Sequence, residues 1–393
     1  MENKITLLPL FFRRGLFFTI IACGLFTSAS AKSELPTAQY IAGKMGVGWN
    51  LGNTLEAIGG EAAWGGGHTS QQLIDSVKAA GFNTVRLPVS WFIHSDTVTS
   101  VIDKDWIARV KEIVNYCIKD ELYVIINMHW DKGWLENRVN KANQDIVNKR
   151  QRAYWTQIAK YFIDFDEHLL FAGANEPNAH DSTAMSVLLT YHQTFIDAVR
   201  ATGGNNSSRT LIVQGPSTDV DNTYKLMNAM PVDKIADRII AEVHYYTPFQ
   251  FCLMEKDADW GKLFYYWGKY NHSTTDSAHN ATWGEESDVE KNFDKMKTKF
   301  VDMGIPVIIG EFSAGKRKLS PPSDQALNSA SVEYYYRYVV KSALSKGLIP
   351  ICWDVPGWLF NRSTGAILDK GIVDAIMQGG AKDASAASRT LKK

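Results

Sequence analysis

Eight short apolar segments, separated by longer stretches with helical periodicity, follow one another along the chain after Lys32. They are rich in Val and Ile, and they lack the apolar–polar alternation of strands with one exposed face. The eight segments are Gly46–Asn50, Thr84–Leu87, Tyr123–Asn127, Leu169–Ala174, Thr210–Val213, Ile239–Val243, Val307–Gly310 and Ile349–Trp353. Such segments predict parallel strands buried on both faces. Eight strand–helix repeats predict an α/β fold, the (β/α)8 or TIM barrel.

Helical signals fill the intervals between these segments. Thr69 or Ser70 is placed to cap one helix that Gly81 ends, and the others carry apolar residues at spacings of three and four. The predicted helices run from Asp105 to Ile118, Asp145 to Ile163, Ala184 to Ala201, Val289 to Met303 and Gln325 to Lys346. Pro350 lies inside the eighth segment. A central strand cannot spare a backbone donor, so we expect Pro350 in the first turn of that strand.

No linker, repeat or low-complexity tract divides the chain, which predicts a single domain over residues 36–380. The most conspicuous insertion, Thr247 to Ser287, follows the sixth strand and is rich in aromatic residues. Residues 381–393 form a small, polar C-terminal tail.

The first 31 residues have the pattern of an export signal. Arg13 and Arg14 precede an apolar run too short for a membrane span, and a small-x-small cleavage site ends at Ala31. This pattern predicts a secreted or periplasmic protein. The alternative is a lipoprotein signal that ends before Cys23, which would leave the protein lipid-anchored at the cell surface through that residue.

Charge and cysteine content narrow the class of partner. Lys plus Arg total 42 and Asp plus Glu total 42, so no basic field exists to hold nucleic acid, and a neutral substrate is expected. The cysteines after the leader are Cys117, Cys252 and Cys352, an odd number without C-x-x-C spacing, which indicates buried thiols rather than a disulfide framework or a zinc site. We expect a monomer.

In a barrel of this kind the active site lies at the carboxyl ends of the strands, and polar residues gather there. They are Asn53, Glu56, Arg86, His129, Asp131, Asn175, Glu176, Gln214, His244, Tyr246, Glu311, Trp353 and Asp354. Glu176 and Glu311 end the fourth and seventh strands, so they should face each other across the mouth of the barrel.

Facing carboxylates suit glycosidic cleavage, in which one protonates the leaving oxygen and the other attacks the sugar or activates water. Asn175 can bind a sugar hydroxyl, Arg86 can hold a carboxylate ionised, and His244 or Tyr246 can orient one of the pair. We expect Glu176 to be held dry, with a raised pKa. Taken alone, Glu176 could instead cap the next helix, with Pro177 at its first position.

Other chemistries lack their motifs. No H-x-H or H-E-x-x-H spacing occurs among the nine histidines, so no metal site is expected. No glycine-rich phosphate loop follows any predicted strand, and no cofactor is expected.

Eight motifs, in order along nearly the whole chain after the leader, resemble glycoside hydrolase family 5, and in particular its secreted bacterial endo-β-1,4-glucanases. They are GWNLGNTLEA (48–57), WGGGHTS (64–70), AAGFNTVRLPVSW (79–91), NMHWDKGWL (127–135), ANEPN (174–178), VHYYTP (243–248), IIGEFSA (308–314) and CWD (352–354). The resemblance implies a (β/α)8 barrel and a retaining mechanism without a cofactor.

The resemblance also implies roles for single residues. Glu176 would be the general acid/base and Glu311 the nucleophile. The surrounding shell would comprise Arg86, His129, Asn175, His244, Tyr246 and Trp353, with Trp353 as a sugar platform. Trp134, Phe249 and Trp358 are candidates for further sugar contacts, although each fits a core position equally well. Xyloglucan, mixed-linkage β-glucan and mannan are alternatives to cellulose-type glucan, and a noncatalytic glycan-binding barrel is the remote alternative.

Two departures from the family pattern stand out. Trp130 occupies a position where many similar glucanases carry a second histidine, and strand alternation predicts that it points outward against the helices. Asn178 to Asp181 replace a basic residue and a Trp-containing loop that often follow Asn-Glu-Pro.

Overall fold

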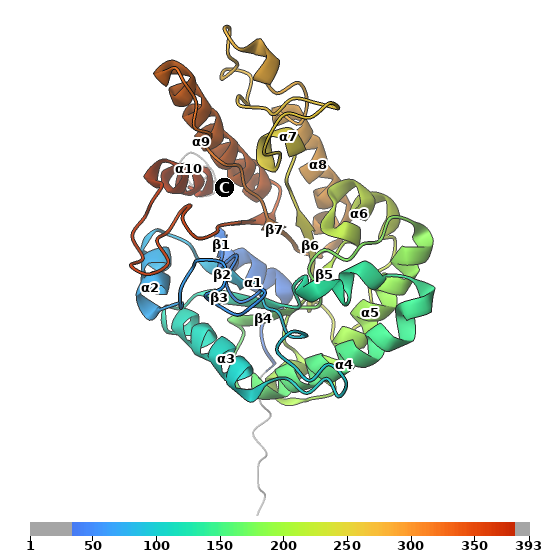
Figure 1. Ribbon diagram of the computed structural model, residues 1–393. Coiled ribbons are helices and arrows are strands. Elements are labelled where there is room, and N and C mark those ends of the chain that lie inside the picture. The colour runs from blue at the N-terminus through green and yellow to red at the C-terminus, as the bar shows by residue number, and fades with distance from the viewer. Residues whose placement is uncertain (1–33, 382–393) are drawn as a thin grey trace, which may run out of the picture. The chain divides into compact units, whose positions relative to one another are not determined.

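Eight parallel strands close into a barrel in the order β1 to β8 (Figure 1). The computed structural model describes residues 34–381, so the predicted leader with Cys23 and nearly all of the predicted tail lie outside the described residues. The strands are β1 (Gly48–Asn50), β2 (Thr84–Leu87), β3 (Tyr123–Asn127), β4 (Leu169–Ala172), β5 (Leu211–Gln214), β6 (Ile239–His244), β7 (Val307–Glu311) and β8 (Leu348–Cys352). The predicted (β/α)8 barrel is confirmed.

Helices surround the barrel, and the five with predicted ranges are found close to them. The α-helices are α1 (Ala38–Met45), α2 (Gln71–Ala79), α3 (Lys104–Lys119), α4 (Gln144–Tyr161), α5 (Ser182–Arg200), α6 (Val220–Leu226), α7 (Phe249–Cys252), α8 (Glu286–Lys299), α9 (Pro322–Ser345) and α10 (Lys370–Gly380). Ser70, rather than Thr69, caps α2 by accepting the backbone N–H of Leu73. The sequence patterns did not predict helices α1, α6, α7 and α10.

Pro350 corrects one expectation, because it lies in the middle of β8 rather than in its first turn. It is in register with Ile309 of β7. On the other side, the ladder to the short strand β1 begins only at Ile351, one residue after the proline. The interruption therefore falls where β8 has little pairing to lose.

The amino-terminal end of the barrel is closed by α1. Ala38, Ile41 and Met45 of this helix are buried against aliphatic residues that point into the barrel, among them Ile212 and Ile308. This half of the interior is a packed apolar plug. The polar residues of the site stand on top of it, toward the carboxyl ends of the strands.

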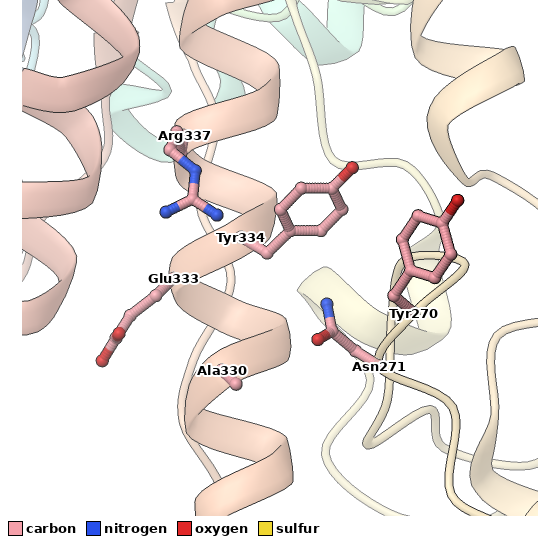
Figure 2. Close-up of a pocket in the computed structure, with 6 residues that line it drawn as sticks. All are labelled: Tyr270, Asn271, Ala330, Glu333, Tyr334 and Arg337. Carbon is pink, nitrogen blue, oxygen red and sulfur yellow. The ribbon is translucent and has the colours of Figure 1, made fainter.

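The insertion after β6 packs on α9. Trp267 lies edge-on to Tyr335 with ring centroids 5.1 Å apart, and Asn328 Nδ2 donates to the carbonyl of Tyr265 over 2.7 Å. A pocket of about 350 Å³ lies between the insertion and α9 (Figure 2), and none of its residues ends a strand. It is lined by Tyr270, Asn271, Ala330, Glu333, Tyr334 and Arg337.

The thiols of Cys117, Cys252 and Cys352 are all buried and free. Over residues 34–381, no helix is both long and apolar enough to cross a membrane.

Candidate active site

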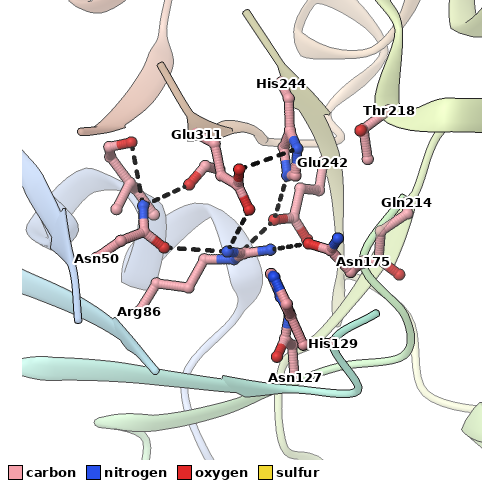
Figure 3. Close-up of polar contacts among 12 residues, drawn as sticks. Asn50, Arg86, Asn127, His129, Asn175, Gln214, Thr218, Glu242, His244 and Glu311 are labelled. Atoms are coloured by element: carbon pink, nitrogen blue, oxygen red, sulfur yellow. Dashed lines mark hydrogen bonds and ion pairs between the residues drawn. The ribbon is translucent and has the colours of Figure 1, made fainter. Parts of the chain in front are cut away.

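Arg86 of β2 lies at the centre of a buried polar network (Figure 3). Its Nη1 donates to Asn50 Oδ1 over 3.0 Å and to Glu311 Oε1 over 2.9 Å, and its Nη2 donates to Asn175 Oδ1 over 2.8 Å. Its Nε lies 3.0 Å from Glu242 Oε1. A fully buried guanidinium is tolerated only when it is paired in this way. Arg86 thereby joins side chains from β1, β6 and β7 with Asn175, which lies in the loop after β4.

A register shift between β6 and β7 places two site residues side by side. Val243 is paired with Ile309, but the next residue, His244, is paired with Glu311, which leaves Gly310 as an extra residue in β7. Bulges of this kind re-aim side chains beside active sites. Here the shift brings the imidazole of His244 beside the carboxylate of Glu311.

Glu311 is almost completely buried, with 7% of its side chain exposed. Its Oε1 accepts from Arg86, and its Oε2 accepts from the hydroxyl of Tyr246 over 2.9 Å. Burial raises the pKa of Glu311, while the positive charges of His244 and Arg86 act in the opposite direction. Donors on both oxygens orient the carboxylate and favour its ionised form.

Glu176 is more open, with 44% of its side chain exposed. Its Oε1 accepts from His244 Nδ1 over 2.7 Å. Burial raises the pKa of Glu176, but the hydrogen bond and charge of His244 outweigh that effect and lower it overall. The expectation of a raised pKa is therefore wrong, because the His244 that orients this carboxylate also places a positive charge against it.

His244 has a carboxylate oxygen opposite each ring nitrogen. Nδ1 faces Glu176, and Nε2 lies 3.4 Å from Glu242 Oε1. Burial alone would lower the pKa of His244, but Glu311, Glu176 and Glu242 together raise it to about 10. A neutral imidazole has only one N–H donor, so this environment favours the imidazolium.

One carboxylate oxygen of Glu176, one of Glu311 and a ring nitrogen of His244 all lie within 4.8 Å of one another. Retaining glycosidases hold their two carboxyl groups about 5 Å apart, whereas inverting enzymes separate them by about 6.5–9.5 Å. The same three residues have the atom types of a metal site. A metal there would first have to displace the proton that His244 Nδ1 donates to Glu176.

His129 and Trp353 stand together at the mouth of the barrel. Their rings are stacked, 5.9 Å apart at 8°. His129 Nδ1 lies 3.1 Å from Asn127 Nδ2, which can only donate, so the proton of the neutral ring is on Nε2. Burial, and then the charges of Arg86 and His244, hold the pKa of His129 well below its ordinary value. His129 is thus a neutral donor beside the partly exposed Trp353.

The prediction that Trp134 binds substrate is wrong. Only 3% of this residue is exposed, and its ring packs between Phe92 and Tyr154 with the guanidinium of Arg150 above it. No face of the indole is free for a sugar. Phe249 and Trp358, by contrast, are substantially exposed and remain candidates. Trp130 is also exposed, at 40%, so it is not buried against helices as expected.

Buried carboxylates hold the loops that carry the site. Glu56 accepts the backbone N–H groups of Asn53 and Thr54, and burial raises its pKa to about 7. The Asn53 side chain is partly exposed beside this turn. Glu136, in a short 3-10 helix after β3, accepts the backbone N–H of Glu176 over 2.7 Å. These carboxylates position the loops through their hydrogen bonds to backbone N–H groups.

The residues after Asn-Glu-Pro have structural partners. Asn178 donates its backbone N–H to the carbonyl of Glu136 over 3.0 Å and its side-chain N–H to Asn137 Oδ1 over 2.7 Å. Asp181 caps α5 by accepting the N–H of Ala184. This part of the chain therefore ties the loop after β4 to the loop after β3.

Sequence reasoning missed Asn50, Glu136 and Glu242. A signal was present for two of them, because Asn50 and Glu242 are polar residues inside otherwise apolar strands, where burial requires a partner. Glu136 lies in a loop and carried no such signal.

Comparison with known protein families shows which family the chain belongs to. The family described as "Cellulase (glycosyl hydrolase family 5)" matches residues 47–356. The chain belongs to glycoside hydrolase family 5. It is thus a glycoside hydrolase of the cellulase type, and the resemblance read from the motifs is confirmed.

Curated relatives within this family cover most of the chain. Endoglucanase A of Paenibacillus barcinonensis is 33% identical over 403 residues, which span 93% of this chain and 97% of the relative. The xyloglucan-specific endo-β-1,4-glucanase of Bacteroides ovatus is 35% identical over 367 residues, which span 87% of this chain and 70% of the relative.

Solved structures of the family superpose well on the barrel. A xyloglucan-specific β-1,4-glucanase from a ruminal metagenomic library, in complex with XXLG, is 42% identical with a TM-score of 0.81, covering 88% of this chain and 96% of that one. A broad-specificity endoglucanase from Bacteroides salanitronis is 32% identical with a TM-score of 0.77, covering 95% and 100%.

Proposed function

We propose that this glycoside hydrolase is an endo-acting β-1,4-glucanase that cleaves neutral plant-cell-wall glucan with retention of configuration. Glu311 is the nucleophile and Glu176 the general acid/base. The observation that carries the proposal is the approach of the two carboxylates, with an oxygen of each within 4.8 Å. That spacing is typical of retaining glycosidases, in which the second carboxylate attacks the sugar directly, whereas inverting enzymes need a wider gap for an attacking water.

In the first step Glu311 attacks the anomeric carbon while Glu176 protonates the leaving oxygen. Arg86 and Tyr246 hold the two oxygens of Glu311 in place for the attack. Glu176 must be protonated at this stage. Because a bound sugar excludes water from its half-exposed carboxyl group, substrate binding raises the pKa of Glu176 toward that state.

In the second step a water hydrolyses the glycosyl-enzyme, and Glu176 now acts as the base. Glu311 is neutral while it is esterified, so His244 has one anionic neighbour fewer. The hydrogen bond from His244 to Glu176 then favours the ionised form of Glu176, as a base requires. The lowered pKa of Glu176 thus suits this half of the reaction.

Xyloglucan is the second candidate substrate. It is favoured by the similarity to the xyloglucan-specific structure, at 42% identity the highest of those described above. Phe249 and Trp358 are exposed aromatic rings available for sugar contacts outside the catalytic centre. The insertion after β6 would then set the width of the cleft for side-chain xylose.

The test is a reducing-sugar assay on carboxymethylcellulose, xyloglucan, lichenan and galactomannan, with product anomers followed by proton NMR. Release of β-anomers from at least one β-1,4-glucan is expected. Initial release of α-anomers would overturn the retaining mechanism, and normal hydrolysis by a folded Glu311→Gln variant would overturn the assignment of the nucleophile. Tight glycan binding without any reducing ends would indicate the noncatalytic alternative.

Export is part of the proposal and rests on the sequence pattern of residues 1–31. Mass spectrometry of the mature N-terminus separates cleavage after Ala31 from lipidation at Cys23. An unprocessed N-terminus in the producing cell would contradict both.

A further inference from the structure

Glu242 is a fully buried carboxylate inside the barrel that the catalytic steps above do not use. It lies two residues before His244 on β6, so strand alternation points both side chains into the barrel. Glu242 therefore stands directly beneath the site, below the layer that contains Glu176 and Glu311.

The contacts of Glu242 connect the two halves of the site (Figure 3). Its Oε1 lies 3.0 Å from Arg86 Nε, which pairs with Glu311, and 3.4 Å from Nε2 of His244, which donates to Glu176. The Nε–H of Arg86 is not aligned as a hydrogen bond, so that contact is an ion pair. The other oxygen of Glu242 accepts from Gln214 Nε2 over 2.5 Å.

Space for this carboxylate depends on Gly310. A Cβ built at Gly310 would lie 2.0 Å from Glu242 Oε1, far inside contact distance. The φ angle of Gly310 is not in the left-handed region, so the absence of a side chain matters for room rather than for backbone freedom. The extra residue of the β7 bulge, immediately before Glu311, is thus also the residue that admits Glu242.

The charges around His244 indicate what Glu242 does in the site. Three carboxylates surround His244, those of Glu176, Glu242 and Glu311. The other groups are Arg86, which pairs with Glu242 and Glu311, the Tyr246 hydroxyl, which donates to Glu311, and the neutral ring of His129. When Glu176 is the protonated acid, Glu242 and Glu311 are the two anions that balance Arg86 and an imidazolium. Without Glu242 the two buried cations would share one carboxylate.

The geometry points to Glu242 as a positioning residue that fixes Arg86 and holds both ring nitrogens of His244 as donors, so that each catalytic carboxylate keeps its partner. This inference rests on the proposed roles of Glu176 and Glu311, but its main readout requires no substrate. It assigns to Gly310 the role of making room for that carboxylate.

The experiment compares Glu242→Gln with the wild type in the full chain labelled with ¹⁵N-histidine. The His244 signals, assigned by their loss in His244→Asn, are followed against pH. In the wild type His244 should stay an imidazolium through neutral pH. In Glu242→Gln its midpoint should fall by about one pH unit or more, because one of its opposite charges is gone. Glu242→Asp, which keeps the negative charge, should bring the His244 midpoint most of the way back to the wild-type value.

A matched control is Glu61→Gln, which breaks another buried Glu–Arg pair, with Arg109, away from the catalytic residues. It should leave the His244 titration unchanged. An unchanged midpoint in Glu242→Gln, or an equal shift in Glu61→Gln, would overturn the inference.

Kinetics supply a second readout. Glu242→Gln should lower kcat about tenfold to a hundredfold, with KM within about threefold of wild type, because the catalytic groups rather than the sugar subsites are displaced. A rise in KM with unchanged kcat would contradict a positioning role. If the wild type hydrolysed no glucan while the His244 shift was present, the proposed function would fail and the charge coupling would stand.

Discussion

His244 Nδ1 donates to Glu176 Oε1 over 2.7 Å, so the shared proton lies on the imidazole rather than on the carboxyl group. A general acid needs the reverse arrangement at the start of the reaction. The proposed acid role of Glu176 therefore requires that substrate binding move it toward its protonated form.

This relationship predicts different pH limits for the free and the bound enzyme. The pKa of Glu176 is lowered, and the acid must be protonated, so kcat/KM should fall as pH rises through that pKa, on the acidic side of neutrality. The alkaline limb of kcat should lie at higher pH, because bound sugar desolvates Glu176. Profiles of both constants on one soluble glucan test this, and coincident limbs would refute it.

Replacing His244 should shift the alkaline limb of the kcat/KM profile. In His244→Asn the group that lowers the pKa of Glu176 is absent, so the alkaline limb of kcat/KM should shift upward although the maximal rate falls. A downward shift would show that His244 does not set the proton state of Glu176.

Glu176→Gln should separate substrates by their leaving groups. Loss of the general acid should slow hydrolysis of polymer by about 10²–10⁴-fold, whereas an aryl glycoside with an acidic phenol needs little protonation and should still form the glycosyl-enzyme quickly. A pre-steady-state burst of phenol measures that step. Equal losses on both substrates would place the acid elsewhere.

The positions of Glu176 and Glu311 could be predicted because residues at strand ends meet at one edge of a parallel barrel. Their proton states could not. They depend on His244, Arg86 and Glu242, whose mutual distances arise from barrel closure and from the bulge at Gly310. Local sequence patterns predict the order of the strands, but they do not predict the distances between charged side chains on different strands.

The exposure of aromatic side chains could not be predicted from local sequence either. Trp134 and Trp358 look alike in sequence, since each directly follows a glycine a few residues after a strand end. Packing by Phe92 and Tyr154 buries the first, while the second stays exposed. Which aromatic faces the sugar is decided by neighbours distant in the chain.

Two alanine variants turn this difference into a prediction. Trp134→Ala should cost about 3–5 kcal/mol of unfolding free energy by creating a cavity, with KM nearly unchanged in the protein that folds. Trp358→Ala should leave stability almost unaltered and raise KM if its ring contacts the glucan. Urea unfolding and KM on xyloglucan distinguish the two, and the opposite pattern would reinstate Trp134 as a sugar contact.

The ion pair between buried Glu61 and part-buried Arg109 should make the fold sensitive to acid. Burial works against the charged form, but Arg109, His68 and the backbone N–H of Thr69 lower the pKa of Glu61 from 4.5 to about 2. Its stabilising effect is therefore full above about pH 4.5 and is lost as pH falls toward about 2. Glu61→Gln should be less stable than wild type at pH 7, and the difference should shrink below pH 4. A constant difference would contradict the linkage.

The insertion after β6 is anchored to α9 by Trp267, Tyr265 and Asn328, and these contacts involve none of the charged residues beneath the mouth. Mutations in this segment can therefore accumulate without disturbing the proton chemistry. Under the proposal that this insertion sets the width of the cleft, polymer preference would be able to change over evolutionary time without loss of the catalytic charges, and laboratory selection for a new glucan would best begin with residues 253–285.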